Sequence, residues 1–244
     1  MALREELEAN GTWLFQKRSY LPLLVIVPVL WSLRSYQYPE GGRLADELWE
    51  VTCLLIGLIG LAIRCFTVGH VAQGTSGRTT RAPMADTLNV TGMYSIVRHP
   101  LYLGNYFMWL GPALFPRSLA TVLIVTLIFW LYYERIMLAE EGYLRARFGA
   151  TFEAWAARTP AIVPRFSNWV APERSFSVYA VLKRESSGLL GLVWVMATLE
   201  LAGEFSVTGH ITLDPLWIAL LSPAVALVLV MRVSRKMRRA RASR

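Results

Sequence analysis

Several segments of the chain are apolar over most of the roughly 20 residues that an α-helix needs to cross a hydrocarbon core of about 30 Å. The sequence is 55% hydrophobic and 17% charged, with a mean hydropathy of +0.40. This balance is too apolar for an ordinary soluble domain of 244 residues. We therefore predict an all-α, polytopic integral membrane protein with about six transmembrane helices. The expected spans are Leu21–Leu33, Trp49–Val68, Leu101–Phe115, Leu119–Met137, Leu189–Leu201 and Leu216–Val233.

The first of these segments, Leu21–Leu33, also resembles the apolar core of a signal peptide, and it contains Pro22 and Pro28. Its charged leader is long, however, and no small-x-small cleavage site follows before Pro39. We therefore favour a short, kinked first span over a cleaved signal peptide.

The distribution of Lys and Arg predicts the orientation of the chain in the membrane. With six spans and a cytoplasmic N-terminus, the outer loops hold only Arg34, Arg43 and Arg117, and the other basic residues fall on the inner side. Both termini are therefore expected in the cytoplasm. The basic run at residues 232–244 suits anchoring to anionic lipid, and no nucleic-acid partner is expected. The Ala- and Arg-rich composition favours a bacterial inner membrane, and the oligomeric state stays open.

Cysteine and histidine give no support for a disulfide or a metal site. Cys53 and Cys65 lie in one expected span, about 18 Å apart along a helix, which is beyond disulfide reach. The three histidines, His70, His99 and His210, have no zinc-ligand spacing. We therefore expect no metal centre.

The stretch "YSIVRHPLYLG" places charged residues directly before an apolar segment. Proline suits the first turn of a helix, so Pro100 is expected to begin the third span with His99 as its cap. The free N–H groups and the positive dipole end of such a helix start attract carboxylates and phosphates. The alternative is that Arg98 and His99 only anchor the span at the membrane surface.

Acidic residues occur where the next span returns to the inner side. Only "FPRSL" separates the third span from the fourth, so Glu134, Glu140 and Glu141 should come close to the start of the third span. Glu141 is expected to pair with Arg145 four residues later. Glu140 points to a different face of the helix from Glu141 and can turn toward His99.

Two polar stretches, residues 70–98 and 140–187, are predicted on the inner side. The first is rich in Gly, Ser, Thr, Pro and Asn and should be a loop with little regular structure. In the second, a helix from about Met137 should stop at Gly149. Another helix, over residues 151–157, should then start on a Thr151 cap with Glu153 in its first turn.

In combination, "GMYSIVRHPLYLG" followed by "EEGYLRARFG" resembles the isoprenylcysteine carboxyl methyltransferase and phospholipid methyltransferase superfamily. The resemblance covers roughly residues 70–166, between N-terminal spans at 1–69 and a C-terminal extension with two spans and a basic tail at 167–244. It implies a polytopic membrane enzyme that binds S-adenosylmethionine in a pocket at the cytosolic face. It also implies that the methyl acceptor is a membrane lipid or a lipidated molecule.

The resemblance also implies which residues contact the cofactor. These are Gln73, Asp86, Thr87, Leu88, Asn89, Tyr94, His99, Pro100, Leu101, Tyr102 and Glu140. The loop over residues 70–98 and the segment 140–166 are expected to cover the cofactor. Arg98, Glu134 and Arg135 are our candidates for catalytic contacts with the acceptor head group, because charged residues at membrane depth are costly and usually functional.

The acceptor stays open between an anionic oxygen and an amine. In the prenylcysteine enzymes an arginine precedes the cofactor glutamate by four residues, but this chain has Ile136 there, which argues against a prenylcysteine carboxylate. An anionic lipid oxygen needs only a cationic partner such as Arg98 or Arg135, whereas an amine needs a base such as Glu134. The abundance of basic residues on the inner side slightly favours the anionic oxygen.

Two other classes of function stay open. A related membrane architecture carries NADPH-dependent reductases, and Arg78 and Arg81 could meet a 2′-phosphate. A non-catalytic haem or transport-accessory protein would need an axial histidine within a span. His70, at the end of the second expected span, is a poor candidate for that role.

Overall fold

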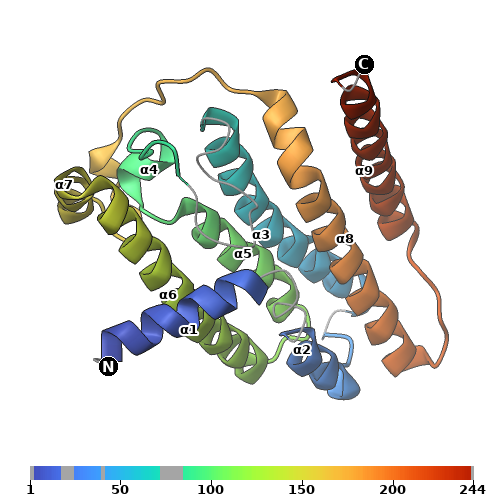
Figure 1. Ribbon diagram of the computed structural model, residues 1–244. Helices are drawn as coiled ribbons and strands as arrows, with labels where there is room; N and C mark the ends of the chain where they lie inside the picture. The colour runs from blue at the N-terminus through green and yellow to red at the C-terminus, as the bar shows by residue number, and fades with distance from the viewer. Residues whose placement is uncertain (1–2, 18–24, 40–41, 72–84, 243–244) are drawn as a thin grey trace.

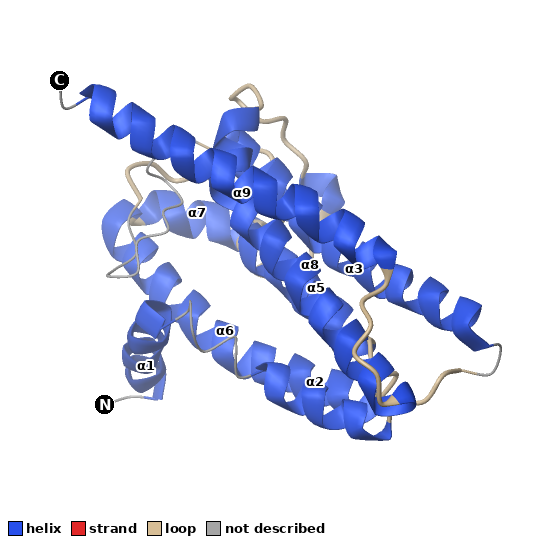
Figure 2. Cartoon of the chain, turned by 90° about the vertical axis from the view of Figure 1, so that its right-hand side faces the viewer, coloured by secondary structure: helices blue, strands red, loops and turns tan. Residues whose placement is uncertain are grey.

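The computed structural model describes residues 3–17, 25–39, 42–71 and 85–242. Within these ranges every regular element is helical (Figure 2). The expectation of an all-α protein is therefore confirmed. The elements are α1 (Leu3–Lys17), α2 (Ile26–Ser32), η2 (Leu33–Ser35), α3 (Gly42–His70), α4 (Met93–Ile96), α5 (Pro100–Leu114), α6 (Leu119–Phe148), α7 (Ala150–Arg158), η3 (Phe166–Asn168), α8 (Val178–Thr208) and α9 (Pro215–Ala242).

Four helices in the described part of the chain are long and apolar enough to cross a membrane: α3, α6, α8 and α9. Their large apolar side chains are exposed along one face, as at Leu55 on α3 and Leu127 on α6, which suits contact with lipid tails. Two expected spans correspond to shorter helices. Helix α5 has 15 residues and α2 has seven, and at 1.5 Å per residue both fall short of a core of about 30 Å.

The four long helices and the shorter α5 lie side by side in the order α6, α5, α3, α8 and α9, and α1 crosses α6 (Figure 1). The short helices α4 and α7 and the starts of α5 and α8 lie at one end, which we call the α4 end. Helix α2 and the loops that follow α5 and α8 lie at the other end, which we call the α2 end. The hairpin of α5 and α6 therefore returns to the α4 end, as the sequence predicted.

Glycines bring α3 and α5 into backbone contact. A Cβ atom placed on Gly60 would lie 2.3 Å from the carbonyl oxygen of Gly104, and one placed on Gly104 would lie 2.5 Å from Arg64 Cγ. Small residues at an interface allow such close approach of membrane helices. The stem of Arg64 therefore lies directly over Gly104.

Two apolar clusters fix the relative positions of the helices. One lies at the α2 end, where the buried Trp217 and Phe115 pack with Met196. The other joins Phe15 of α1 to Phe129 and Ile136 of α6. Helix α1 thus covers the half of α6 that carries the glutamate pair.

The boundaries around Gly149 agree in part with the expectations. Helix α6 ends before Gly149, which has φ +51°, so the predicted stop is confirmed; the helix is continuous from Leu119 and does not begin near Met137. Helix α7 starts at Ala150 with Glu153 in its first turn. The expected Thr151 cap is wrong, because Gly149 occupies the cap position and no side chain caps this helix.

Candidate active site

The start of α5 is held in place by the segment that follows α7. The N–H groups of Arg98 and His99 donate to the carbonyls of Pro160 and Ala161, at 2.8 and 3.2 Å. Pro100 begins the helix and His99 occupies its cap position, as predicted from the sequence, although no side-chain capping bond forms. The residues before α5 are therefore held by backbone contacts from residues 62 positions further along the chain.

Glu141 binds both charged residues of the "RHP" motif. Arg98 Nε donates to Glu141 Oε1 at 2.8 Å, and His99 Nε2 lies 3.0 Å from the same oxygen. Arg98 Nη1 also donates to the carbonyls of Ala156 and Thr159, at 2.9 and 2.7 Å. Arg98 thus ties the start of α5 to α6 and to the end of α7.

The expected pairing of Glu141 with Arg145 is wrong. Arg145 binds Glu153 of α7 instead, because α7 folds back along the end of α6. The side chains of Arg98 and Glu141 are only 17% and 16% exposed, so this pair is formed away from bulk water. A sheltered arginine with three acceptors holds the carboxylate better than a surface arginine one turn away.

Glu140, the first acid of the pair, faces Tyr102. The Tyr102 hydroxyl donates to Glu140 Oε1 at 2.6 Å. Glu140 Oε2 lies 3.8 Å from His99 Nδ1, which is too long for a hydrogen bond, and the side chain is 24% exposed. This oxygen can therefore accept a hydrogen bond from a bound molecule.

A second group of polar side chains, which was not predicted from the sequence, lies deeper in the bundle. Arg64 donates from Nε and Nη2 to Glu185 of α8 at 2.8 and 2.9 Å, and from Nη1 to Asn105 at 2.6 Å. Asn105 in turn donates to the Tyr133 hydroxyl at 2.9 Å, and the Tyr133 ring packs against Tyr102 at 4.8 Å. The available signal was an arginine within an apolar helix, which is usually functional.

The structure brings only some of the predicted cofactor contacts together. His99, Tyr102 and Glu140 meet, and Pro100 and Leu101 adjoin them in the first turn of α5. Tyr94 lies in α4, where its carbonyl accepts a bond from Trp155 Nε1 at 3.0 Å. Asp86 and Thr87 are exposed on the segment leading to α4, and Leu88 and Asn89 beside them are half-buried. Gln73 lies outside the described residues.

The predicted acceptor contacts are also separated. Arg98 is engaged by Glu141 and two carbonyls. Glu134 is exposed on α6, and Arg135 donates back to the carbonyl of Leu131 in its own helix. Neither of these two reaches the glutamate pair. No group of three His, Cys, Asp or Glu side chains suited to a metal ion occurs among the described residues.

A family model and several known proteins match the chain. The family model described as phospholipid methyltransferase matches residues 52–151, which include all of α5 and α6 and most of α3. The chain is 33% identical over 165 residues to the cobalt-zinc-cadmium resistance protein CzcN of Cupriavidus metallidurans, covering 64% of this chain and 71% of that protein. No solved structure matches the chain.

Two further relatives carry methyltransferase names. The protein-S-isoprenylcysteine O-methyltransferase of Schizosaccharomyces pombe is 28% identical over 120 residues, covering 48% of this chain and 50% of that protein. Methanethiol S-methyltransferase 2 of Bradyrhizobium diazoefficiens is 36% identical over 171 residues, covering 62% of this chain and 60% of that protein. The acceptors in these two names differ, so the names alone do not define an acceptor.

Proposed function

Because the chain belongs to the isoprenylcysteine carboxyl methyltransferase and phospholipid methyltransferase superfamily, we propose that it transfers a methyl group from S-adenosylmethionine to a lipid or lipidated acceptor. The observation that supports this proposal is that side chains of the "RHPLY" motif at the start of α5 contact both glutamates of the "EE" motif on α6. Tyr102 binds Glu140, while Arg98 and His99 bind Glu141. These contacts gather three of the residues that the resemblance assigns to the cofactor, His99, Tyr102 and Glu140.

The residues of the cluster fit a cofactor with hydroxyl and ammonium donors. Glu140 has one oxygen bound by Tyr102 and a second that can accept a bond from a ribose hydroxyl or an ammonium group. Arg98 and Glu141 hold the helix start in position. The proposed cofactor contacts remain the motif residues on α4, α5 and α6, together with the segment 86–89 and Gln73.

The proposed transfer is an in-line displacement. S-adenosylmethionine supplies a methyl group on a sulfonium; a bond to the acceptor forms as the bond to sulfur breaks, and the broken bond's electron pair stays on sulfur. No covalent enzyme nucleophile is needed. The task of the protein is to hold donor and acceptor aligned and to exclude water.

For the acceptor we propose an anionic lipid oxygen, recognised by cationic groups between the helices. Arg64 and Asn105 lie deeper than Glu140. Because Arg64 already donates to Glu185 and Asn105, its proposed role is to orient the Asn105 amide, which would contact the acceptor. Arg98, Glu134 and Arg135 stay as proposed contacts nearer the membrane surface. Arg98 already donates three hydrogen bonds within the protein. Its proposed role is therefore to hold the start of α5 in position rather than to bind the acceptor directly.

We further propose that the α4 end faces the cytoplasm of a bacterial inner membrane. Arg34, Arg43 and Arg117 lie toward the α2 end, while the chain beyond residue 140 carries most other basic residues at or near the α4 end. Helices α2 and α5 would then act as short spans that complete six crossings, with both termini in the cytoplasm. The cofactor would bind at the cytosolic face.

The proposal is tested by calorimetric titration of S-adenosylmethionine into the detergent-solubilised protein. We expect saturable binding by the wild type and at least about tenfold weaker binding by Glu140→Ala, which removes a charged acceptor. Glu173→Ala is the matched control, because Glu173 is an exposed acid on the connection to α8. A labelled-methyl screen of extracted lipids then identifies the acceptor.

A folded wild type that fails to bind millimolar S-adenosylmethionine would refute the proposal. Thermal protection by NADPH under the same conditions would then favour a reductase. A Soret band in the purified sample would favour a haem protein.

A further inference from the structure

The connection between α7 and α8, residues 159–177, crosses the α4 end of the molecule (Figure 1). Its backbone is bonded to two other parts of the fold. The Gly92 N–H, directly before α4, donates to the carbonyl of Val170 at 2.9 Å, and the Ser177 N–H donates to the carbonyl of Gly69 on α3 at 2.9 Å. Backbone that is paired within the protein can lie at a membrane surface without unsatisfied polar groups.

Helix α3 has one exposed apolar face that leads to this connection. Its exposed large apolar side chains are spaced alternately four and seven residues apart, which keeps them within about 60° of one another around the helix. They are Leu44, Leu48, Leu55, Ile59 and Phe66. Because α3 is long and apolar enough to cross a membrane, this face suits contact with lipid tails, and Phe66 lies at its α4 end.

Two aromatic side chains of the connection continue this face. The ring centroids of Trp169 and Phe66 lie 6.1 Å apart, and the Phe176 ring lies 5.3 Å from His70, which follows Phe66 by one turn. Trp169 and Phe176 are 47% and 46% exposed. Tryptophan and other aromatic rings collect where a span meets the headgroup layer. The two rings therefore lie at the level where α3 leaves the hydrocarbon.

Arginines accompany the aromatic rings. Arg165 and Arg174 lie on the connection and Arg158 ends α7, whereas Glu173 is the acid of this stretch; all four side chains are exposed. The carbonyl of Arg174 lies 2.7 Å from His70 Nδ1, so its backbone is level with the rings. Guanidinium groups bind phosphate oxygens strongly, and cations beside a membrane are attracted to anionic lipid.

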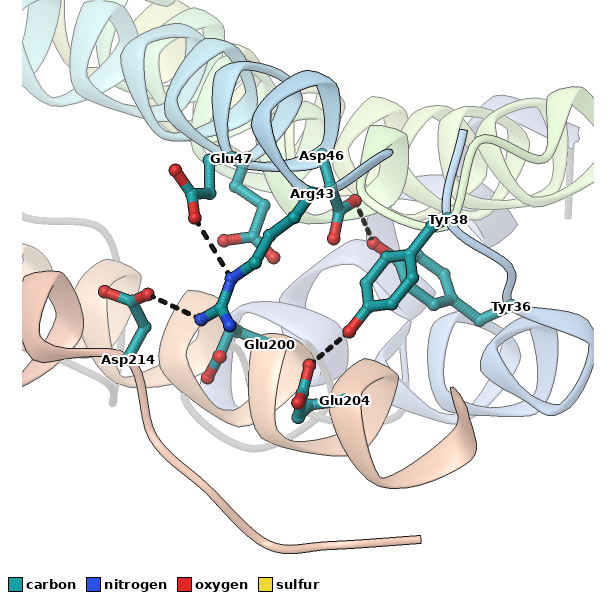
Figure 3. A pocket seen from close by; sticks show the side chains of 9 residues that line it. Tyr36, Tyr38, Arg43, Asp46, Glu47, Glu200, Glu204 and Asp214 are labelled. Atoms are coloured by element: carbon teal, nitrogen blue, oxygen red, sulfur yellow. Dashed lines mark hydrogen bonds and ion pairs between the residues drawn. The ribbon is translucent and has the colours of Figure 1, made fainter. Parts of the chain in front are cut away.

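The α2 end carries the opposite charge. A small pocket there is lined by nine residues, of which six are acids, Glu200 among them, and one is a cation, Arg43. Figure 3 shows Arg43 between Glu47 and Asp214, and it pairs with both at 3.2 and 3.3 Å. An anionic lipid surface is therefore matched in charge by the α4 end and not by the lining of this pocket.

We propose that the α7–α8 connection docks on the anionic phospholipid layer at the α4 end. Trp169 and Phe176 lie at the boundary between acyl chains and headgroups, and Arg165 and Arg174 bind lipid phosphates. The docked surface is continuous with the lipid-facing side of α3. Because Val170 of the connection is bonded to the residue before α4, anionic lipid also stabilises the position of α4.

Nitroxide labels test the depth of the connection in lipid nanodiscs. Labels are placed at Trp169→Cys and Phe176→Cys, with Leu55→Cys on α3 as the lipid reference and His210→Cys on the exposed α8–α9 connection as the water reference. The ratio of oxygen collisions to collisions with a water-soluble nickel chelate should be at least about threefold higher at both connection sites than at His210→Cys, because aromatic belts lie at the acyl boundary.

The unsubstituted chain gives the labelling background, since Cys53 is buried and Cys65 is half-buried. Thermal unfolding of each labelled protein shows whether it is folded.

Thermal unfolding also tests the charge of the lipid. The wild type should melt several degrees higher in nanodiscs that contain phosphatidylglycerol than in nanodiscs of phosphatidylcholine alone. Arg165→Gln/Arg174→Gln should lose at least about a third of this gain, because each cation near the surface adds to the attraction. Arg165→Lys/Arg174→Lys is the matched control and should keep the gain, since both charges remain. Both side chains are exposed, so neither pair of changes disturbs the interior.

Collision ratios at Trp169→Cys and Phe176→Cys equal to that of His210→Cys would overturn the proposal, because the connection would then face water and suit a protein partner or a second copy. An equal gain from phosphatidylglycerol in the Gln and Lys pairs would also overturn it. Neither measurement involves S-adenosylmethionine, so the result is independent of the proposed function.

Discussion

The Tyr102 hydroxyl donates a 2.6 Å hydrogen bond to Glu140 Oε1, and this contact joins the start of α5 to the C-terminal part of α6. The two residues lie 38 positions apart in the sequence. Their contact depends on the tight α5–α6 hairpin and on Arg98, which binds Glu141 one residue further along. The Tyr102–Glu140 and Arg98–Glu141 contacts can therefore form only when α5 and α6 are packed against each other.

Tyr102→Phe should weaken S-adenosylmethionine binding by roughly tenfold, because a hydrogen bond to a charged group contributes about 1.5 kcal/mol. Titration calorimetry of the variant measures the change. Tyr106→Phe is a matched control, since Tyr106 lies one turn along α5 and its hydroxyl contacts Thr126 at 3.3 Å. Equal affinity in both variants would argue against a cofactor role for the Tyr102–Glu140 contact.

Arg98→Lys should lower the thermal stability of the detergent-solubilised protein. Lysine keeps the charge but cannot reach Glu141 and the carbonyls of Ala156 and Thr159 together. We expect a loss of about 2 kcal/mol, as for other broken buried networks. If the melting temperature stayed unchanged while methyl transfer fell, Arg98 would instead be an acceptor contact.

The Arg64–Glu185 pair allows stability and function to be separated. Arg64→Met alone should destabilise the fold by about 3 kcal/mol, because it leaves a buried carboxylate unpaired. The double variant Arg64→Met/Glu185→Leu should recover most of that loss. It should still transfer methyl groups at least about tenfold more slowly, because Asn105 loses the donor that orients it.

Thermal unfolding and single-turnover methyl transfer check the Arg64 prediction together. Binding of S-adenosylmethionine to the double variant, measured in parallel, shows that its cofactor site is intact. Full turnover in a stable double variant would show that the pair only holds α8 against α3.

Gly104→Ala should destabilise the protein by about 2 kcal/mol, in the range of other overpacked interiors. The added Cβ would lie 2.5 Å from Arg64 Cγ and 2.7 Å from the Gly60 carbonyl oxygen, so α3 and α5 would have to separate. Gly191→Ala on α8 is the control, because nothing lies within 4 Å of its Cβ position. Chemical denaturation in detergent compares the two variants, and equal stability would contradict the close helix contact.

Local sequence signals predicted the elements that carry the site. Pro100 after His99 marked the start of α5, and Gly149 marked the end of α6, because both residues act through their own backbone geometry. The partner of Glu141 was predicted wrongly. A four-residue spacing favours Arg145, but the fold of α7 places Glu153 beside Arg145 and leaves Glu141 to Arg98.

The sequence by itself determined that the chain is helical and built for a membrane, and that "RHPLY" and "EE" belong to a methyltransferase family. Periodicity, apolar length and motif spacing are local properties, so they can be read without coordinates. Only the tertiary structure decided that Arg64 meets Glu185 across 121 positions and that Glu200 lines an acidic pocket at the far end. Such contacts depend on how helices pack, and packing is set by all the side chains at an interface together.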